Sequence, residues 1–338
     1  MYSVGTQIQN WTFQSLDELE QLRISANAKH INRFQSVLAE RPDIVSDDFL
    51  TAREETVICR IVSESGIRFG DDFKPEMWPS VRWIAFSYFK RFYLRESAME
   101  YYPKNVMMAC YYLAAKVDEF NVSIDNFVDN LRNGTRQYNT ETILTLEPDV
   151  MLKLNYNLTV HTPYRPFEGH LIEMKTKIGR QLSEIEFDLE SIRPMSSEFL
   201  KNSLLSDAMF LYSPSQIALA AVKFGMDKAL GEVRSSTLMV DFLAVLLDVD
   251  IGDAGGRGTA DILQLEKLQV RLDQICKLVL QQFAQGVSAE ESASLQTKFL
   301  AYTQKESELM PLLIQLEKAN LETVGGTNGA GFDSDEDF

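Results

Sequence analysis

The sequence has few of the residues that build metal sites or disulfide frameworks. It contains 3 cysteines and 3 histidines in 338 residues. Cys59, Cys110 and Cys276 lie far apart, and no histidine stands at zinc-ligand spacing from them. We therefore interpret the cysteines as reduced thiols buried in the helices of an intracellular protein, and we expect no metal and no other cofactor.

Signatures of catalysis are also missing. The HExxH and GxSxG motifs do not occur, and no glycine-rich loop follows a strand pattern. Carboxylates are abundant, but general acid–base catalysis needs a partly buried pair in a pocket, and no pattern singles out such a pair. We expect the chain to have no enzyme activity of its own.

Basic residues are too few for a nucleic-acid or membrane surface. The chain has 33 lysines and arginines against 49 aspartates and glutamates, which gives a net charge of −16. DNA, RNA and anionic membranes all require clustered positive charge, so we expect direct contact with none of them. No signal peptide and no apolar run of 18 residues is found, which favours a location in the cytosol or the nucleus.

Helical periodicity is what the sequence does have, whereas the alternation typical of strands is absent over any useful length. We therefore predict an all-α protein. The predicted helices cover residues 15–39, 50–69, 79–95, 103–117, 123–132, 140–154, 260–283 and 289–321.

An internal repeat relates two of these helices. The segment 99–109 resembles the segment 209–220, and Pro103 and Pro214 begin a helix rich in small residues in both copies, at an offset of 111 residues. Small residues on a central helix let its neighbours approach closely. The repeat predicts two helical bundles of similar plan, joined near residues 161–165.

The rim of the first copy carries charges that the second copy lacks at the same positions. Lys116 and Glu119 stand at the end of a helix that is apolar nearly all round, and they correspond to Asp227 and Leu230 in the second copy. A lysine and a glutamate at the rim of a buried helix indicate a contact for another chain. The repeat therefore predicts a partner-binding site, including Glu119, on the first bundle only.

Several longer motifs resemble the cyclin family, in particular its H-type members. The likeness covers about residues 10–225, and the two five-helix cyclin boxes of that family agree with the repeat. With flanking N- and C-terminal helices, the resemblance implies an all-α chain of two cyclin boxes. The motifs are Trp11-Thr12-Phe13, Tyr88-Phe89-Lys90-Arg91-Phe92-Tyr93-Leu94, Met99-Glu100-Tyr101-Tyr102-Pro103, the run 113–123, Pro163–Gly169 and Tyr212–Leu219.

The resemblance implies a regulatory subunit that binds and activates a cyclin-dependent kinase. In the family this subunit belongs to the CDK-activating kinase complex together with a RING-finger assembly subunit. That complex phosphorylates cell-cycle kinases and, within TFIIH in the nucleus, the RNA polymerase II C-terminal domain. Two alternatives remain at this point: another transcriptional cyclin with a different kinase, and a TFIIB-like cyclin-fold transcription factor. The second needs a zinc ribbon and a basic surface, which the sequence lacks.

The resemblance also assigns site residues. A lysine and a glutamate of the family hold the backbone of a kinase segment, and they match Lys116 and Glu147. Lysine offers only donors and a carboxylate only acceptors, so the two together suit an exposed backbone turn. Val117, Met151 and Tyr156 are the apolar part of the expected surface, although an ordinary core position is an equally good interpretation of Met151 and Tyr156. Because Pro148 follows Glu147, we expect the helix to restart or kink there.

The predicted domains follow from these elements. Asp248–Thr259 has calcium-loop spacing of aspartates but no glutamate at its twelfth position, so we interpret it as a glycine-rich connection. Asp333–Asp337 has no apolar content and is expected to be disordered. The boundaries are an N-terminal extension at 1–49, a first, kinase-binding box at 50–160, a second box at 161–287 with a glycine-rich loop near 250–260, a C-terminal helix at 288–324 and an acidic tail at 325–338.

Overall fold

The structure is a computed structural model that describes residues 2–40, 48–249 and 258–325. All secondary structure in these residues is helical, which confirms the predicted all-α class. In chain order the elements are η1 (Tyr2–Val4), α1 (Thr6–Trp11), α2 (Leu16–Arg33), α3 (Gln35–Glu40), α4 (Ala52–Asp72), α5 (Pro79–Phe92), α6 (Pro103–Val117), α7 (Ile124–Val128), α8 (Arg136–Lys153), α9 (Tyr164–Glu184), η3 (Leu189–Ile192), α10 (Arg193–Ser203), α11 (Ala208–Leu211), α12 (Pro214–Leu230), α13 (Glu232–Leu246), α14 (Gly258–Ala284) and α15 (Ala289–Gly325).

Helices α4–α8 form a first bundle, which we call the first box. Its central helix is α6, which has Pro103 in its first turn. The N–H group that proline lacks would have no partner within the helix at this position, so no helical hydrogen bond is lost. Ala109, Ala114 and Ala115 have no exposed surface, so α5 and α8 pack closely against α6. The predicted role of small residues on this helix is correct.

Helices α9–α14 form a second bundle, the second box, around α12. The side chain of Ser213 accepts a hydrogen bond from the backbone N–H of Gln216, and the Gln216 side chain accepts one from the Ser213 N–H, so α12 has a complete capping box. Ala218, Ala220 and Ala221 are fully buried. The two bundles therefore repeat the same construction, as the offset between their prolines predicts.

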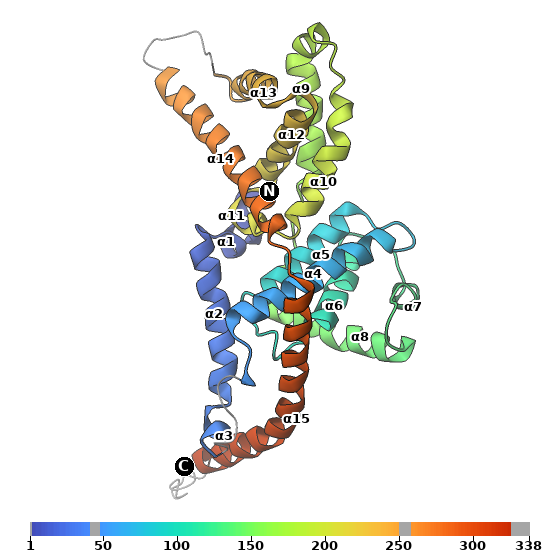
Figure 1. Cartoon of the computed structure of the whole chain (residues 1–338), viewed down its shortest axis with the longest axis vertical. Helices are drawn as coiled ribbons and strands as arrows, with labels where there is room; N and C mark the ends of the chain where they lie inside the picture. The colour runs from blue at the N-terminus through green and yellow to red at the C-terminus, as the bar shows by residue number, and fades with distance from the viewer. Residues whose placement is uncertain (1, 41–47, 250–257, 326–338) are drawn as a thin grey trace, which may run out of the picture.

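The molecule is elongated because helices from both ends of the chain extend beyond the boxes. In Figure 1 the second box lies at the top and the first box at the middle right, while α2 and α15 run side by side toward the bottom. These end helices enclose a separate apolar core. Its buried members are Phe34, Val37, Phe49, Leu50, Ile58, Met99, Leu295, Phe299, Tyr302, Leu309 and Leu313.

The predicted single helix at 15–39 is two helices. Helix α2 ends at Arg33, where the hydrogen-bond pattern changes: the N–H of Phe34 donates to the carbonyl of Ile31, only three residues earlier. This break turns Phe34 and Val37 into the core between α2 and α15, where both are buried. A long-range apolar contact thus overrides the local helical pattern.

Of the two outcomes expected at Pro148, a restart or a kink, the restart is wrong, because α8 is continuous through the proline. Proline removes the hydrogen bond to the carbonyl of the residue four positions earlier, here Leu144. The Leu144 side chain is 46% exposed, so this carbonyl lies on the solvent side of α8, where water can satisfy it. Glu147 therefore keeps a regular helical position.

Three further predictions concern the cysteines and the chain end. Cys110 is buried, Cys59 and Cys276 are half-buried, and all three are free thiols whose pKa values are raised by burial. Helices α14 and α15 agree with the helices predicted at 260–283 and 289–321. Residues 250–257 of the glycine-rich loop and residues 326–338 of the acidic tail lie outside the described residues.

Candidate partner-binding site

The end of α6 forms one edge of the candidate site. Helix α6 ends at Val117, and the backbone then turns because Glu119 adopts a left-handed conformation with φ of 58°. The N–H of Phe120 closes this turn by donating to the carbonyl of Ala115 at 2.9 Å. Lys116, Val117 and Glu119 are consequently exposed at the rim of the helix, whereas Ala115 and Phe120 are buried.

Lys116 and Glu147 form an ion pair between α6 and α8. Glu147 lies on the buried stripe of α8 together with Asn139, Ile143 and Val150, and its side chain is only 9% exposed. The Lys116 side chain is 45% exposed, and its ammonium also lies 4.8 Å from the centre of the Tyr112 ring. The two residues predicted to act together are therefore in direct contact, with the lysine toward solvent.

The turn after α8 presents Tyr156. Asn155 and Tyr156 have φ values of 51° and 56°, and the N–H of Tyr156 donates to the carbonyl of Met151 at 2.9 Å. This turn leaves Tyr156 65% exposed, so it is a surface residue rather than a core residue. Met151 is half-buried against the main core, and Val117 is 39% exposed.

An exposed apolar stripe on α8 was missed by the sequence analysis. Leu144 and Leu152 are 46% and 55% exposed, and with Pro148 between them they are spaced four residues apart on one side of the helix. The four-residue spacing of Leu144, Pro148 and Leu152 is visible in the sequence. We call the combined surface the α6–α8 face. It consists of Lys116, Val117, Glu119, Leu144, Glu147, Met151, Leu152 and Tyr156.

Lys153 fixes the end of α8 that carries this face. Its ammonium lies 3.1 Å from a carboxylate oxygen of Glu96, whose side chain is 7% exposed, and 5.5 Å from the Tyr101 ring. Burial opposes the charged form of Lys153, but its contacts with Glu96 raise its pKa above the usual value. The α6–α8 face is thus held in place before any partner binds.

Comparison with known proteins identifies the family. Residues 74–159 match the family model of the cyclin N-terminal domain, and residues 162–240 match that of the cyclin C-terminal domain. The chain is 42% identical to cyclin-H of Xenopus laevis over 226 residues, which cover 66% of this chain and 67% of the frog protein. The chain belongs to the cyclin H family.

More distant proteins support this assignment. Probable cyclin-H of Echinococcus multilocularis is 30% identical over 241 residues, covering 65% of this cyclin and 70% of that protein. A solved structure of the CAK complex from Chaetomium thermophilum bound to ATP-gamma-S contains a chain with a TM-score of 0.68 and 22% identity, over 100% of this cyclin and 98% of that chain. At that identity the likeness shows the fold. Members of the cyclin family are kinase regulators without catalytic activity.

The second box of this cyclin differs at the corresponding place. Lys223, one turn before Asp227 on α12, pairs with Asp227 at 2.8 Å and with Asp273 of α14 at 3.1 Å. At the positions that match Lys116 and Glu119, the second copy has Asp227 and Leu230. The cation–carboxylate contact that links α12 to α14 comes from another position, the one that matches Tyr112.

The described residues contain neither a candidate metal cluster nor a membrane-spanning helix. Within residues 2–40, 48–249 and 258–325, no group of three or more histidine, cysteine, aspartate or glutamate side chains is placed to hold a metal ion. In the same ranges, no helix of this cyclin is both long and apolar enough to span a membrane.

Proposed function

We propose that this cyclin binds a cyclin-dependent kinase through the α6–α8 face and activates it as the regulatory subunit of a CDK-activating kinase. The observation that carries this proposal is the Lys116–Glu147 pair, which is already formed on the first box and is surrounded by exposed apolar side chains.

The pair suits a partner backbone. The ammonium of Lys116 has three donors and only one ion-pair partner among the described residues, Glu147, so donors remain for carbonyls of a bound segment. Glu147 is nearly buried, which keeps its carboxylate oriented, and its remaining acceptor positions suit N–H groups. A partner that covers the pair removes it from water. Hydrogen bonds to charged groups are stronger in the resulting low-dielectric environment than in water.

The apolar side chains of the α6–α8 face provide exposed surface that a partner can bury. Val117, Leu144, Leu152 and Tyr156 are all at least 39% exposed, although three of them belong to residue types that are usually buried. Exposed apolar side chains gathered around a charged pair are typical of a protein–protein interface, in which buried anchors contribute most of the free energy. A kinase segment that packs here gains both hydrophobic contact and directional hydrogen bonds.

The assembly follows from the relatives. The Chaetomium thermophilum match is part of a CAK complex, and a second solved match, with a TM-score of 0.59 and 19% identity, is part of the yeast TFIIK complex. We propose that this chain assembles in the same way with a cyclin-dependent kinase and a RING-finger assembly subunit. Within TFIIH the complex would phosphorylate the RNA polymerase II C-terminal domain, and in its free form it would phosphorylate cell-cycle kinases. A nuclear location is part of this proposal.

A reconstitution experiment tests this function. The purified chain alone is expected to bind no ATP and to transfer no phosphate, and the kinase recovered with it from a cell extract is expected to gain peptide-phosphorylating activity when the chain is added. Mass spectrometry of the recovered kinase distinguishes a CDK-activating kinase from the kinase of another transcriptional cyclin. Phosphate transfer by the isolated chain, or no change in the activity of the recovered kinase, would contradict the proposal.

A further inference from the structure

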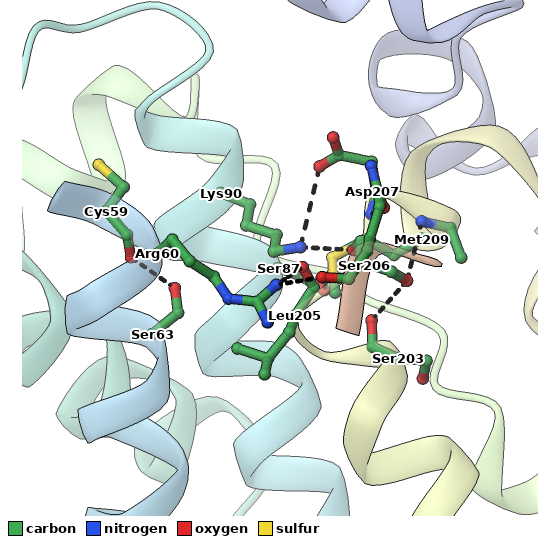
Figure 2. A network of polar contacts seen from close by, with 12 residues as sticks. Cys59, Arg60, Ser63, Ser87, Lys90, Ser203, Leu205, Ser206, Asp207 and Met209 are labelled. Atoms are coloured by element: carbon green, nitrogen blue, oxygen red, sulfur yellow. Dashed lines mark hydrogen bonds and ion pairs between the residues drawn. The ribbon is translucent and has the colours of Figure 1, made fainter. Parts of the chain in front are cut away.

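Two adjacent cations on α5 do not belong to the α6–α8 face. Lys90 and Arg91 are part of the motif Tyr88–Leu94; the Lys90 side chain is 11% exposed and Arg91 is 2% exposed. Both cations contact parts of their own chain that lie outside the first box. Figure 2 shows the Lys90 side chain directed at the backbone of Ser206 and at the carboxylate of Asp207.

Arg60 of α4 reaches the same loop of the second box. Its guanidinium donates to the carbonyl of Leu205 at 3.1 Å, to that of Gln282 at 3.0 Å and to that of Phe283 at 3.2 Å. Gln282 and Phe283 belong to the last turn of α14, where backbone carbonyls have no partner within the helix and the helix dipole favours a cation. One side chain thus joins the first box to two separate segments of the second box.

A third segment, helix α2, also contacts this loop, through Asp207. Arg23 of α2 donates to its carboxylate at 2.8 Å, and Lys90 lies 3.8 Å away. Burial favours the protonated form of Asp207, but the charges of Arg23 and Lys90 prevail and hold its pKa below the usual value. The N–H of Asp207 also donates to the side chain of Gln282 at 2.7 Å. The N-terminal helix, the first box and α14 therefore all meet the loop at residues 204–207.

The connection between the boxes is held from another side of α5. The guanidinium of Arg91 donates to the carbonyl of Asn157 at 3.1 Å and lies 5.2 Å from the centre of the Trp11 ring. The hydroxyl of Tyr88 donates to the carbonyl of Leu158 at 2.5 Å. Both acceptors belong to the segment between α8 and α9, so α5 fixes the path of the chain between the boxes.

We propose that Arg23, Arg60, Lys90 and Asp207 form an inter-box clamp that sets the orientation of the second box, and of the start of α15, relative to the first box. Helices of the two boxes contact one another only sparsely, and a cavity of about 610 Å³ lies beside the clamp, bordered by Arg60, Lys90 and Asp207. Buried apolar side chains of both boxes belong to one continuous core, and the directional polar contacts of the clamp fix the angle at which the two halves of that core meet.

Buried ion networks suit this role. The free energy that charges lose when they leave water is nearly as large as the free energy gained from their mutual attraction, so such networks add little net stability. Their geometry selects one arrangement of the parts that they join. The clamp also fixes the C-terminal helix, because α14 ends next to Arg60 and only residues 285–288 separate it from α15. The inter-box clamp makes the two boxes and α15 one rigid surface for any partner that touches more than one of them.

A distance measurement tests the clamp. Spin labels are attached to the full chain at Glu141→Cys on α8 and at Arg180→Cys on α9, both exposed positions, and the distance distribution between them is recorded by pulsed electron paramagnetic resonance. The clamp variants are Arg60→Ala and Lys90→Met. Arg132→Ala is the matched control, because it removes an exposed ion pair with Asp72 inside the first box.

The expected result is one narrow distribution for the parent chain and for Arg132→Ala, and a broader or shifted distribution for both clamp variants. Narrow distributions at the parent distance in both clamp variants would overturn the proposal. Arg60→Lys is recorded as well, because it keeps the charge in a compact head that cannot reach all three carbonyls. Its distribution is expected to be broader than that of the parent, and it decides the matter if Arg60→Ala does not fold.

Kinase affinity separates this inference from the proposed function. The α6–α8 face lies outside the clamp, so Arg60→Ala and Lys90→Met are expected to bind the kinase within about threefold of the parent affinity. A parent chain that binds no kinase would contradict the proposed function and leave the distance result intact. A parent-like distance in the clamp variants would contradict the clamp and leave kinase binding intact.

Discussion

The two cyclin boxes have central helices of the same construction, but the charged residues that link each central helix to its neighbour differ. In the first box, the pair of Lys116 and Glu147 joins α6 to α8, and the lysine is 45% exposed. In the second box, Lys223 joins α12 to α14, is only 20% exposed and contacts two carboxylates, those of Asp227 and Asp273. One lysine keeps donors for a partner, whereas the other is already surrounded by acceptors of its own chain.

This difference shows which part of a duplicated fold is constrained. The central helices keep fully buried alanines in both copies because neighbouring helices must approach them closely. The rim has no such constraint, so position 116 is a lysine and its counterpart at 227 is an aspartate. A duplicated core therefore indicates the fold, and the rim that differs between the copies indicates where a partner binds.

The largest expected effect is that of Lys116→Ala. Removing one member of a desolvated charged contact costs about 2–5 kcal/mol, much of it from the group left without a partner. We expect kinase affinity to fall at least tenfold, which corresponds to about 1.4 kcal/mol. Isothermal titration calorimetry measures the affinity.

Asp227→Ala is the matched control in the second box. Asp227 occupies the corresponding position and pairs with Lys223, which keeps Asp273 as a partner. Kinase affinity is expected to stay within about twofold. Equal losses of affinity at positions 116 and 227 would break the comparison between the boxes.

The apolar stripe on α8 is expected to have a smaller effect. Leu152→Ala and Tyr156→Ala each remove an exposed apolar side chain from the α6–α8 face, and we expect each to weaken kinase binding by about three- to tenfold. Val270→Ala serves as the control, since Val270 is 56% exposed on α14 of the second box. A loss for Val270→Ala as large as that for Leu152→Ala would show that the kinase also covers the second box.

Local patterns in the sequence were sufficient for much of this structure. Pro103 and Pro214 begin their helices as predicted, and the pairing of Lys116 with Glu147 agrees with the resemblance. Long-range contacts account for the failures. The core between α2 and α15 breaks the helix at Phe34, and the contact of Lys90 with the second box was not predicted. Neither contact leaves a periodic signal in the sequence.

Raising the pH is expected to affect two half-buried lysines differently. Burial lowers the pKa of Lys90 to about 8, below its ordinary value of 10.5. Between these values the unfolded chain binds more protons, so this group adds stability as the pH rises. Burial also opposes the charge of Lys223, but Asp227 and Asp273 raise its pKa, so its contribution is complete below pH 10.5 and is lost as the pH rises through the folded-state pKa.

Urea unfolding of three proteins measures this difference. From pH 8 to pH 10, the free energy of unfolding of the parent is expected to rise relative to that of Lys90→Met. Over the same range, the difference between the parent and Lys223→Met should stay constant. A parallel response of the two variants would mean that the two lysines have similar environments, against the geometry of the clamp.

The smallest effect is expected from deleting residues 325–338. The segment 333–337 carries four carboxylates and no apolar side chain, so we predict that it adds little to kinase binding and at most a weak, salt-sensitive contact with a basic surface. Ser334 stands among these acids as a candidate target of acid-directed kinases. Affinity and activation assays on the truncated chain check the prediction, and a tenfold loss of affinity would refute it.

Site-specific photo-crosslinking tests most directly which box binds the kinase. A benzophenone amino acid replaces Tyr156 in the first box in one sample and Val270 in the second box in another, both at exposed positions. After irradiation of the complex, the account predicts a covalent product with the kinase from position 156 and none from position 270. Crosslinking from position 270 alone would contradict the claim that the α6–α8 face of the first box is the kinase-binding surface.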